Sequence, residues 1–501
     1  MKKNFIRNVA VMGLLFVSSL TMSAQEKTYE CQPLNPELQT MADKVMEFAL
    51  EDPEKADREF TKLTKKASKS ADDLLSLGDY FLQKDYLQGA MICSKYVYEK
   101  NAADYDVLMF CGEVRMKMQD WGNAGSKFDE ILSYDPNNVT AMKRRAFVYK
   151  NINPIAATED LLRIIELEPD YYKAYKDLGD IYYKQDKYVE ACSYYKDYYK
   201  AVPKDIAHID IRSCENYLQS LYSQAQFDSI IIVAKEIQPL DPMDIVIRRM
   251  DFFAKINKIQ EAFDYDKALA EAQSAGNYIY NKEYADSIYL YLDYEYAAAL
   301  EKEKGDIPAA ITYYEKALAK DSTKLGGYKE LSNLCIRNKQ YDKGIEAYNI
   351  YLQKRGDKVD TADRFLLATK YVYACLDETT TPEKKNDYRA KAEATFKEVI
   401  DKKPDFVQAY IQLARLNNTN TQKPIAAVRD YYNKVLEVSE SKADEFAAQR
   451  FEACRYIFFY DVSIVPEDFE DAKRICAILK SIRPDDEFVK NAEQFLQQNA
   501  Q

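Results

Sequence analysis

Glycine and histidine are scarce in this chain of 501 residues, which has 13 glycines and one histidine. Gly-rich phosphate loops, nucleotide-binding turns and turn-dense β-sandwiches all need more glycine than this. A single histidine argues against Ser-His-Asp catalysis and against a metal site built from several histidines. Lys and Arg number 70 against 82 Asp and Glu, and the formal charge of −12 argues against a nucleic-acid binder, which needs a basic face.

Tyrosine, in contrast, is abundant, with 42 residues. Hydrophobic residues make up 47% of the chain, which argues against a disordered protein. The length suits about three domains or one long repeat array. The composition therefore predicts an α-rich protein that is not an enzyme and that holds no metal and no cofactor.

The segment 1–24 has the layout of a secretory signal peptide. Lys2, Lys3 and Arg7 precede an apolar run at 9–20, which is shorter than the roughly 20 residues of a membrane-spanning helix. Small residues follow, and cleavage after Ala24 is the preferred interpretation. Cleavage one residue earlier, or an uncleaved anchor, are the alternatives.

No later segment is apolar enough to span a bilayer. We therefore expect an exported, acidic protein with no integral membrane span after signal cleavage. In a bacterium with an outer membrane, its place would be the periplasm, the envelope or the cell surface.

A regular period runs along the chain, with a step of about 34 residues. The same step, to within one position, leads from Gly78 to Gly112, from Pro136 to Pro169, and from Pro169 to Pro203. Because different marker residues keep the same spacing, the pattern indicates internal repeats.

The clearest unit, residues 172–205, predicts two helices. Leu178 and Gly179 belong to the apolar stripe of the first helix, and Tyr195 belongs to the stripe of the second. Gly179 allows the neighbouring helix to come close. Pro203 ends the second helix and sets the entry to the next unit.

This unit resembles the tetratricopeptide repeat (TPR). The likeness rests on a large first-helix residue, a Leu-Gly pair, an aromatic residue one turn later, small, aromatic and apolar residues in the second helix, and a final proline. The units that match best lie at 71–104, 105–138, 139–171, 172–205, 291–324 and 325–358. The resemblance implies an all-α, right-handed superhelical solenoid of about 10–11 TPR-like helix-turn-helix units. First helices would line its concave face.

The predicted organisation follows the repeats. It consists of a signal peptide (1–24), an extended leader (25–35), an N-terminal TPR array (36–244), a degenerate helical repeat (245–290), a C-terminal TPR array with loop insertions (291–484), and a capping helix with a tail (485–501). The insertions at 376–388 and 461–466 are expected in helix-to-helix connections. They are either interaction loops or tolerated lengthening.

Nine cysteines follow the signal, and no CxxC occurs. The positions on apolar stripes predict buried free thiols: Cys111, Cys214, Cys335 and Cys476. A disulfide between stacked units, for example at Cys93, is the alternative. His208 has no metal-ligand neighbour in sequence, so we expect no metal site and no catalytic role there.

Binding residues are expected on the concave face. Tyr183, Tyr222 and Tyr373 lie one residue off the core stripes, and tyrosine offers a large contact area with a polar hydroxyl. Lys329 and Asn333 resemble the first pair of the clamp by which some TPR proteins hold the C-terminal carboxylate of a chaperone. Most other tyrosines are expected in the core.

The rest of that clamp is predicted to be absent, because the next first helix offers Phe365, Leu366 and Thr369. We expect a non-enzymatic scaffold that binds a protein or peptide partner in its concave groove, in envelope assembly or a multiprotein complex. Its acidic field would favour basic segments. The alternative is an envelope protein that binds a glycan or small ligand by aromatic stacking.

Overall fold

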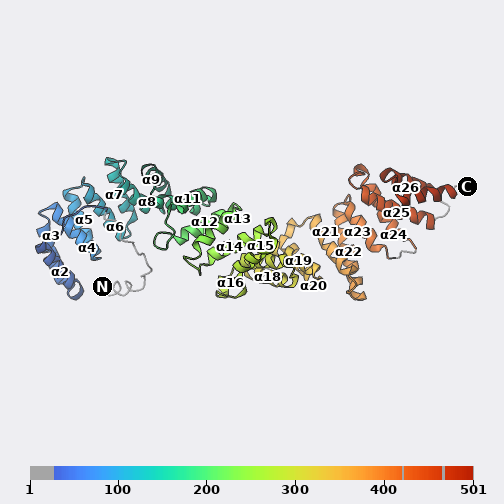
Figure 1. Ribbon diagram of the computed structural model, residues 1–501, viewed down its shortest axis with the longest axis horizontal. Coiled ribbons are helices and arrows are strands. Elements are labelled where there is room, and N and C mark those ends of the chain that lie inside the picture. Colours follow the sequence, from blue (N-terminus) through green and yellow to red (C-terminus); the bar gives the residue numbers. More distant parts are fainter. Residues whose placement is uncertain (1–27, 420–422, 465–468, 500–501) are drawn as a thin grey trace. The chain divides into compact units, whose positions relative to one another are not determined.

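The computed structural model describes residues 28–419, 423–464 and 469–499. Within these ranges the chain forms helices joined by short connections and no strand, which confirms the predicted all-α solenoid (Figure 1). The predicted signal peptide lies outside the described residues. The chain divides into two compact units, 1–250 and 251–501. The finer boundaries inferred from the repeats stay predictions.

The first unit is a run of helix pairs. They are α2 (Pro36–Glu51) with α3 (Pro53–Ala67), α4 (Ala71–Gln83) with α5 (Leu87–Lys100), α6 (Tyr105–Lys117) with α7 (Trp121–Tyr134), α8 (Val139–Tyr149) with α9 (Pro154–Leu167), α10 (Tyr172–Lys184) with α11 (Tyr188–Ala201), and α12 (Ile211–Ser223) with α13 (Phe227–Ile237). The α14 helix (Ile245–Lys258) crosses into the second unit.

The second unit begins irregularly, with η1 (Ile259–Glu261), α15 (Tyr265–Ala275), α16 (Asn277–Tyr280) and η2 (Asp286–Ile288). Regular pairs then follow. They are α17 (Tyr291–Glu303) with α18 (Ile307–Lys320), α19 (Leu325–Arg337) with α20 (Tyr341–Arg355), α21 (Thr361–Leu376) with α22 (Pro382–Lys402), α23 (Val407–Asn417) with α24 (Ala426–Val438), and α25 (Ala447–Ile464) with α26 (Phe469–Ile482). Short η3 (Gly356–Lys358) and η4 (Glu440–Lys442) lie between pairs, and α27 (Glu487–Gln498) ends the unit.

First helices face the inner side of each array. Those of successive pairs contact each other, as α2 with α4, α4 with α6, α10 with α12, and α19 with α21. Among the described residues, no two second helices approach as closely. A row that is tighter on one side curves toward that side, so each unit has its concave side on the first helices, as predicted.

Glycine allows the tight packing inside a pair. A Cβ atom added at Gly112 would lie 2.5 Å from the ring of Phe128, and one at Gly179 would lie 2.5 Å from the ring of Tyr195. No side chain fits at such distances without movement of the neighbouring helix. The predicted role of Gly179 is therefore confirmed.

The turn inside each pair repeats one backbone device. A residue with positive φ follows the first helix in several units: Asp85, Gln119, Asp186, Ala225, Gly305 and Lys339. The next N–H then reaches back to a carbonyl in the last turn, as from Asp120 to Arg115 and from Gln226 to Leu221. This is the Schellman type of helix end, which usually takes glycine. Here most positions hold other residues, at a conformational cost.

Tyrosine side chains tie the more widely spaced second helices together. The Tyr98 hydroxyl on α5 donates to Glu130 on α7 over 3.0 Å, and that of Tyr199 on α11 donates to Glu236 on α13 over 2.6 Å. The long ring spans the gap, and the hydroxyl satisfies its hydrogen bond on a carboxylate. Only four tyrosines of the described residues are exposed, namely Tyr96, Tyr134, Tyr265 and Tyr373.

The two predicted insertions are largely helical, which corrects the expectation of loops. The α22 helix starts at Pro382 behind the cap Thr381, so only 377–381 is left between α21 and α22. Proline at the first position and a threonine cap favour a helix start. Likewise α25 continues to Ile464, and 465–468 lie outside the described residues.

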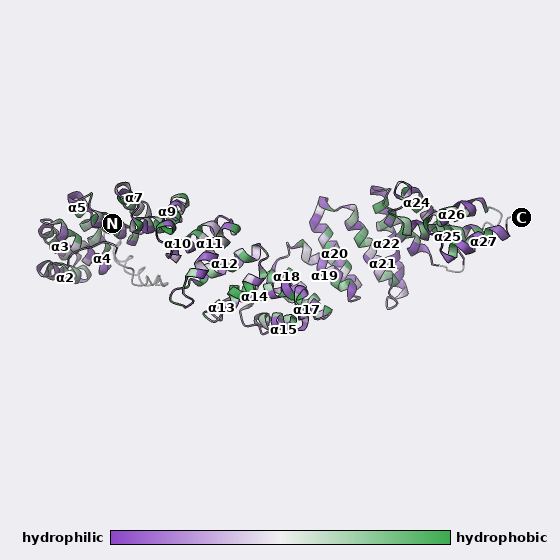
Figure 2. Ribbon diagram, turned by 45° about the horizontal axis from the view of Figure 1, so that its top comes forward, coloured by the Kyte–Doolittle hydropathy of each residue, from purple (hydrophilic) through white to green (hydrophobic). Residues whose placement is uncertain are grey.

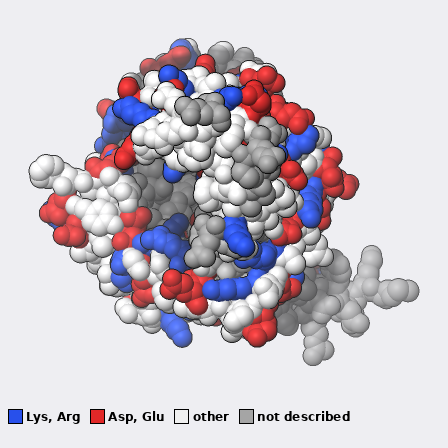
Figure 3. Space-filling model, turned by 90° about the vertical axis from the view of Figure 1, so that its right-hand side faces the viewer, with Lys and Arg blue, Asp and Glu red and all other residues white. Residues whose placement is uncertain are grey.

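Apolar and polar residues alternate along the helices in the hydropathy view, as stripes facing the core require (Figure 2). No helix of the described residues is long and apolar enough to cross a membrane. Despite the net charge of −12, acidic and basic side chains are interspersed on the face that Figure 3 shows. Local sites can therefore differ in sign from the chain as a whole.

All nine cysteines are free thiols, and all but Cys31 are buried. This confirms the predicted burial of the four stripe positions. Burial raises the pKa of Cys93, Cys111 and Cys454 to about 12. A thiol that is both buried and protonated is a poor nucleophile.

The turn position provides a matched pair of stability tests. Ala225→Gly is expected to raise the free energy of unfolding by about 0.5–1 kcal/mol, because glycine adopts φ of 54° without strain. Gly305→Ala at the equivalent turn, where φ is 79°, is expected to lower it by about 1 kcal/mol. Urea denaturation followed by circular dichroism measures both. Shifts in the same direction for the two variants would contradict the account of this turn.

The thiols should differ in reactivity. In the native protein Cys31 alone is expected to react rapidly with Ellman's reagent, whereas all nine should react in guanidinium chloride. A Cys31→Ser variant, which removes the one half-buried thiol, should then show no rapid native reaction. Rapid labelling of several native thiols would contradict the buried packing.

Candidate functional site

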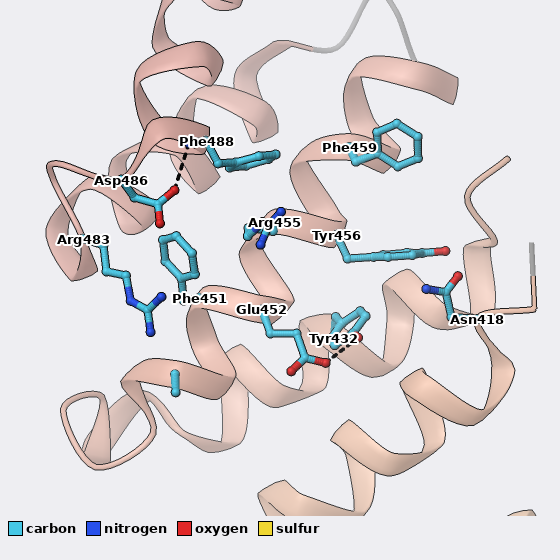
Figure 4. Close-up of a pocket in the computed structure, with 11 residues that line it drawn as sticks. Asn418, Tyr432, Phe451, Glu452, Arg455, Tyr456, Phe459, Arg483, Asp486 and Phe488 are labelled. Carbon is cyan, nitrogen blue, oxygen red and sulfur yellow. Dashed lines mark hydrogen bonds between the residues drawn. The ribbon is translucent and has the colours of Figure 1, made fainter. Parts of the chain in front are cut away.

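A pocket of about 610 Å³ opens beside α25 in the second unit. The exposed face of this first helix provides most of its wall, and α24, the end of α23, and the α26–α27 connection complete it. The lining consists of Asn418, Tyr432, Ala448, Phe451, Glu452, Arg455, Tyr456, Phe459, Arg483, Asp486 and Phe488 (Figure 4). Residues on α25 spaced by three or four share one face, which explains how one helix presents so many of them.

Aromatic rings form much of the surface. Phe451 is buried, whereas 41% of Phe459 is exposed. The Tyr456 hydroxyl accepts a hydrogen bond of 2.7 Å from the Ile425 backbone N–H, and this bond orients its ring. The rings offer apolar contact area at a low cost in side-chain entropy.

Two arginines lie against these rings. The Arg455 guanidinium is 4.8 Å from the centroid of Phe488, and that of Arg483 is 4.5 Å from the centroid of Phe451. Both arginines are exposed, and neither makes an ion pair with a carboxylate of the described residues. Stacking holds each guanidinium by its face and leaves its N–H edge for a ligand.

The charge of the Glu452 carboxylate is already balanced by a partner inside the protein. Arg415 donates to it from two nitrogens, over 2.8 and 2.5 Å, and the Tyr432 hydroxyl donates over 2.9 Å. Burial raises the pKa of Glu452, but the bonds from Arg415 and Tyr432 outweigh it and the pKa is lowered. Asp486 serves as the cap of α27 and accepts from the Phe488 N–H over 2.9 Å. Both acids of the pocket therefore have partners of their own.

The arrangement can bind an anion next to an apolar group. Guanidinium edges form charge-assisted, often bidentate bonds with carboxylates, and the rings beside them offer apolar contact. Asn418 is half-buried and adds an amide. An anionic ligand would be opposite in charge to the basic segments that the net charge suggested.

The residues predicted from the sequence lie elsewhere, and none of them lines this pocket. Tyr183 on α10 is half-buried and donates to Gln219 on α12 over 2.8 Å, so it links two first helices. Tyr222 packs on Phe227 within its own pair. Tyr373 on α21 is 60% exposed. Whether any of them contacts a partner stays a prediction.

Lys329 and Asn333 do lie together with a third residue, Lys370, which sequence analysis missed. The Lys370 ammonium donates to the Asn333 side chain over 2.8 Å and lies 4.7 Å from the centroid of Tyr348. Burial, together with the charge of Lys329, lowers the pKa of Lys370 to about 8. The side-chain carbonyl oxygen of Asn333 is thus used inside the protein.

The pocket residues were missed because α25 has little of the TPR pattern. Phe451, Arg455 and Phe459 follow each other at i, i+4 and i+8, and this spacing alone could have marked an exposed face. Arg483 and Phe488 come from a different helix pair, and only the fold brings them close.

Lys370 provides a pH test. Between about pH 8 and 10.5 the unfolded chain binds more protons than the folded one, so the free energy of unfolding should rise with pH in this window. Lys370→Met should therefore stabilise the protein by about 1–3 kcal/mol at pH 7, and this gain should shrink by pH 10. Thermal denaturation at several pH values measures it.

Lys329→Met is the matched control, since it removes a neighbouring charge and leaves Lys370 in place. It should stabilise less, and its gain should likewise shrink with rising pH. A gain for Lys370→Met that is the same at pH 7 and pH 10 would contradict a lowered pKa.

Comparisons with known proteins agree with this architecture. Residues 153–206 match the model of the tetratricopeptide repeat. A stretch of 70 residues, which is 14% of this chain, is 36% identical to sperm-associated antigen 1 of Mus musculus. The match spans only about 8% of the length of that curated relative.

Solved structures that are similar to this chain include the C-terminal part of a TPR repeat-containing protein from Cytophaga hutchinsonii. It is 18% identical, with a TM-score of 0.43, over 56% of this chain and 98% of that one. A tetratricopeptide repeat protein from Parabacteroides merdae is 16% identical, with a TM-score of 0.33, over 53% of this chain and 98% of that one. With the family match at 153–206 and the helix pairs found along the described residues, this chain is a tetratricopeptide repeat protein.

Proposed function

We propose that this protein is a non-enzymatic scaffold that binds a segment of a partner protein in the pocket on α25. The observation that carries the proposal is the pair of exposed arginines, Arg455 and Arg483, each stacked on a phenyl ring and without a carboxylate partner among the described residues. A protein ligand supplies both carboxylates and apolar side chains along one extended chain, which suits a groove of this size.

The geometry favours a segment with at least one carboxylate next to an apolar or aromatic residue. The lining holds two guanidiniums, on Arg455 and Arg483, and two carboxylates, on Glu452 and Asp486. Because Glu452 is already paired with Arg415, an incoming carboxylate meets arginines that are held in place by stacking.

The place of action belongs to the same proposal. The basic start and short apolar run of residues 1–24 support export, and a role in envelope assembly or a multiprotein complex would follow from it. Gel shift of the precursor on processing and fractionation of the producing cell test this part separately.

Glycan binding is a second candidate, and one observation favours it. A pocket of about 390 Å³ in the second unit is lined by several tyrosines, including Tyr280, Tyr294 and Tyr313, beside Lys316. The Lys316 ammonium lies 5.0 Å from the centroid of Tyr313. Aromatic faces with nearby polar groups can stack on sugar rings.

Peptide selection tests the main proposal. Random peptides displayed on phage and selected on the wild-type protein should be enriched in Asp or Glu beside an aromatic or aliphatic residue. The double variant R455Q/R483Q should bind a selected peptide about 10–100-fold more weakly, because two charge-assisted bonds are lost. Fluorescence anisotropy measures the affinities.

Arg163→Gln is the control, because this exposed arginine lies on α9 of the other unit and pairs with Glu166. It should leave the affinity unchanged. Equal binding by the double variant and the wild type would refute the pocket as the site. A strong glycan-array signal that Tyr313→Ala removes, without peptide binding, would favour the second candidate.

A further inference from the structure

The described part of the leader before the first helix lies against the concave side of the first unit. Its residues 28–34 form no helix, and their polar contacts reach α4 and α6. These are two successive first helices that also contact each other. The leader thus lies on the inner side of the array, where a bound segment of a partner would lie.

Tyr29 is the centre of this contact. Only 7% of it is exposed, and its hydroxyl donates to the Asp79 carboxylate on α4 over 2.6 Å. Its ring meets Phe110 on α6 edge to face, with centroids 5.5 Å apart. A tyrosine inserted between two helices, with its hydroxyl on a buried acid, makes the kind of contact that anchors a peptide in a groove.

Polar contacts hold the chain on both sides of this anchor. The Thr28 hydroxyl donates to Glu113 over 2.9 Å, and the Glu30 backbone N–H donates to Asp106 over 2.9 Å. The Cys31 thiol lies 3.3 Å from the second oxygen of Asp79. Acids on both α4 and α6 therefore receive donors from consecutive positions of the leader.

The leader does not fill the space that it enters. A cavity of about 520 Å³ remains beside it, lined by leader residues and by α4, α6 and the turn before α6. The carboxylates of Asp72, Asp104 and Asp106 line this cavity, and so does Glu30 of the leader itself. The carboxylate of Glu30 is repelled by these aspartates, whereas a lysine or arginine at this position would be attracted by them.

We propose that the groove over α4 and α6 is a second peptide-binding site, which the chain's own leader occupies as a built-in competitor. Its outside ligand is an extended segment of a partner protein that carries a tyrosine for the place of Tyr29 and a basic residue directly after it. This site belongs to the first unit and takes a ligand opposite in charge to that of the pocket on α25.

Tethering makes the leader an effective competitor despite its small contact area. A segment joined to its site by a short stretch of chain has an effective concentration on the order of mM. An outside ligand must therefore bind better than the leader, and the basic residue after the tyrosine provides this advantage. Glu30, Gln32 and Pro33 are exposed, and Tyr29 is the one buried side chain among residues 28–34.

The full-length protein and short peptides test the proposal. A fluorescent peptide with the sequence of residues 28–34, TYECQPL, is titrated against the wild type and against Tyr29→Ala. Saturable binding is expected for Tyr29→Ala and none for the wild type, because the leader of the variant no longer holds the groove. The peptide with alanine in place of its tyrosine should not bind. Tyr134→Ala, which changes an exposed tyrosine on α7, is the control and should behave as the wild type.

A second peptide, TYKCQPL, tests the chemistry of the partner. With lysine beside the acidic cavity it should bind Tyr29→Ala several-fold more tightly than TYECQPL, and added salt should reduce this difference. Equal or weaker binding would overturn the assignment of a basic ligand. No saturable binding of either peptide to folded Tyr29→Ala, up to about 1 mM, would overturn the site itself.

Hydrogen exchange in the wild type covers the case in which Tyr29→Ala fails to fold. A leader that leaves its groove separately should exchange the amides of residues 29–32 with a smaller opening free energy than those of α4 and α6. Exchange of the leader only together with these helices would show that it is a fixed part of the fold and would overturn the proposal.

Discussion

A pair of short helices cannot bury its apolar stripe alone, and this constraint governs the whole array. Each pair uses the next one as its cover, so first helices pack closely and second helices are left further apart. Glycine at the helix contact, as at Gly112 and Gly179, permits the first arrangement. Tyrosines such as Tyr98 and Tyr199 bridge the wider gap between second helices with a ring and a hydrogen bond to a carboxylate. Some of the tyrosines and acidic residues of this chain thus join neighbouring helix pairs.

The sequence was enough to predict the fold but not the site. A repeat leaves the same signal many times, and the stripe residues Leu178, Gly179 and Tyr195 already mark both helices of one unit and the contact between them. The residues of a pocket occur only once in the sequence and form no recurring pattern. Arg455 and Arg483 lie far apart in sequence on different helix pairs, and no spacing rule joins them.

Two further differences have local causes. Lys370 directly follows Thr369 on α21, and its place in the sequence does not show which residues its side chain contacts. Its burial beside Asn333 becomes visible only once the helices are packed. The sequence also predicts a loop where α22 begins, because the polar residues of a helix start are hard to distinguish from those of a loop.

The net charge of the chain says little about what its surfaces attract. Within each unit, the inner face takes its local charge from a few first helices. The groove on α4 and α6 is acidic, whereas the pocket on α25 has two stacked arginines. The two sites are thus of opposite sign, a difference that the overall composition does not show.

The buried thiols have a consequence for how such a chain is made. Eight of the nine cysteines are buried, and all nine are reduced in the folded protein. In an oxidising compartment, each of the eight buried thiols would be open to wrong pairing until its own helix pair closes. Contacts in a repeat array are local, and local contacts form early, so each thiol is shielded soon after its stretch of chain arrives. In such a compartment folding and oxidation would compete, and the local contacts of the repeat architecture would favour folding.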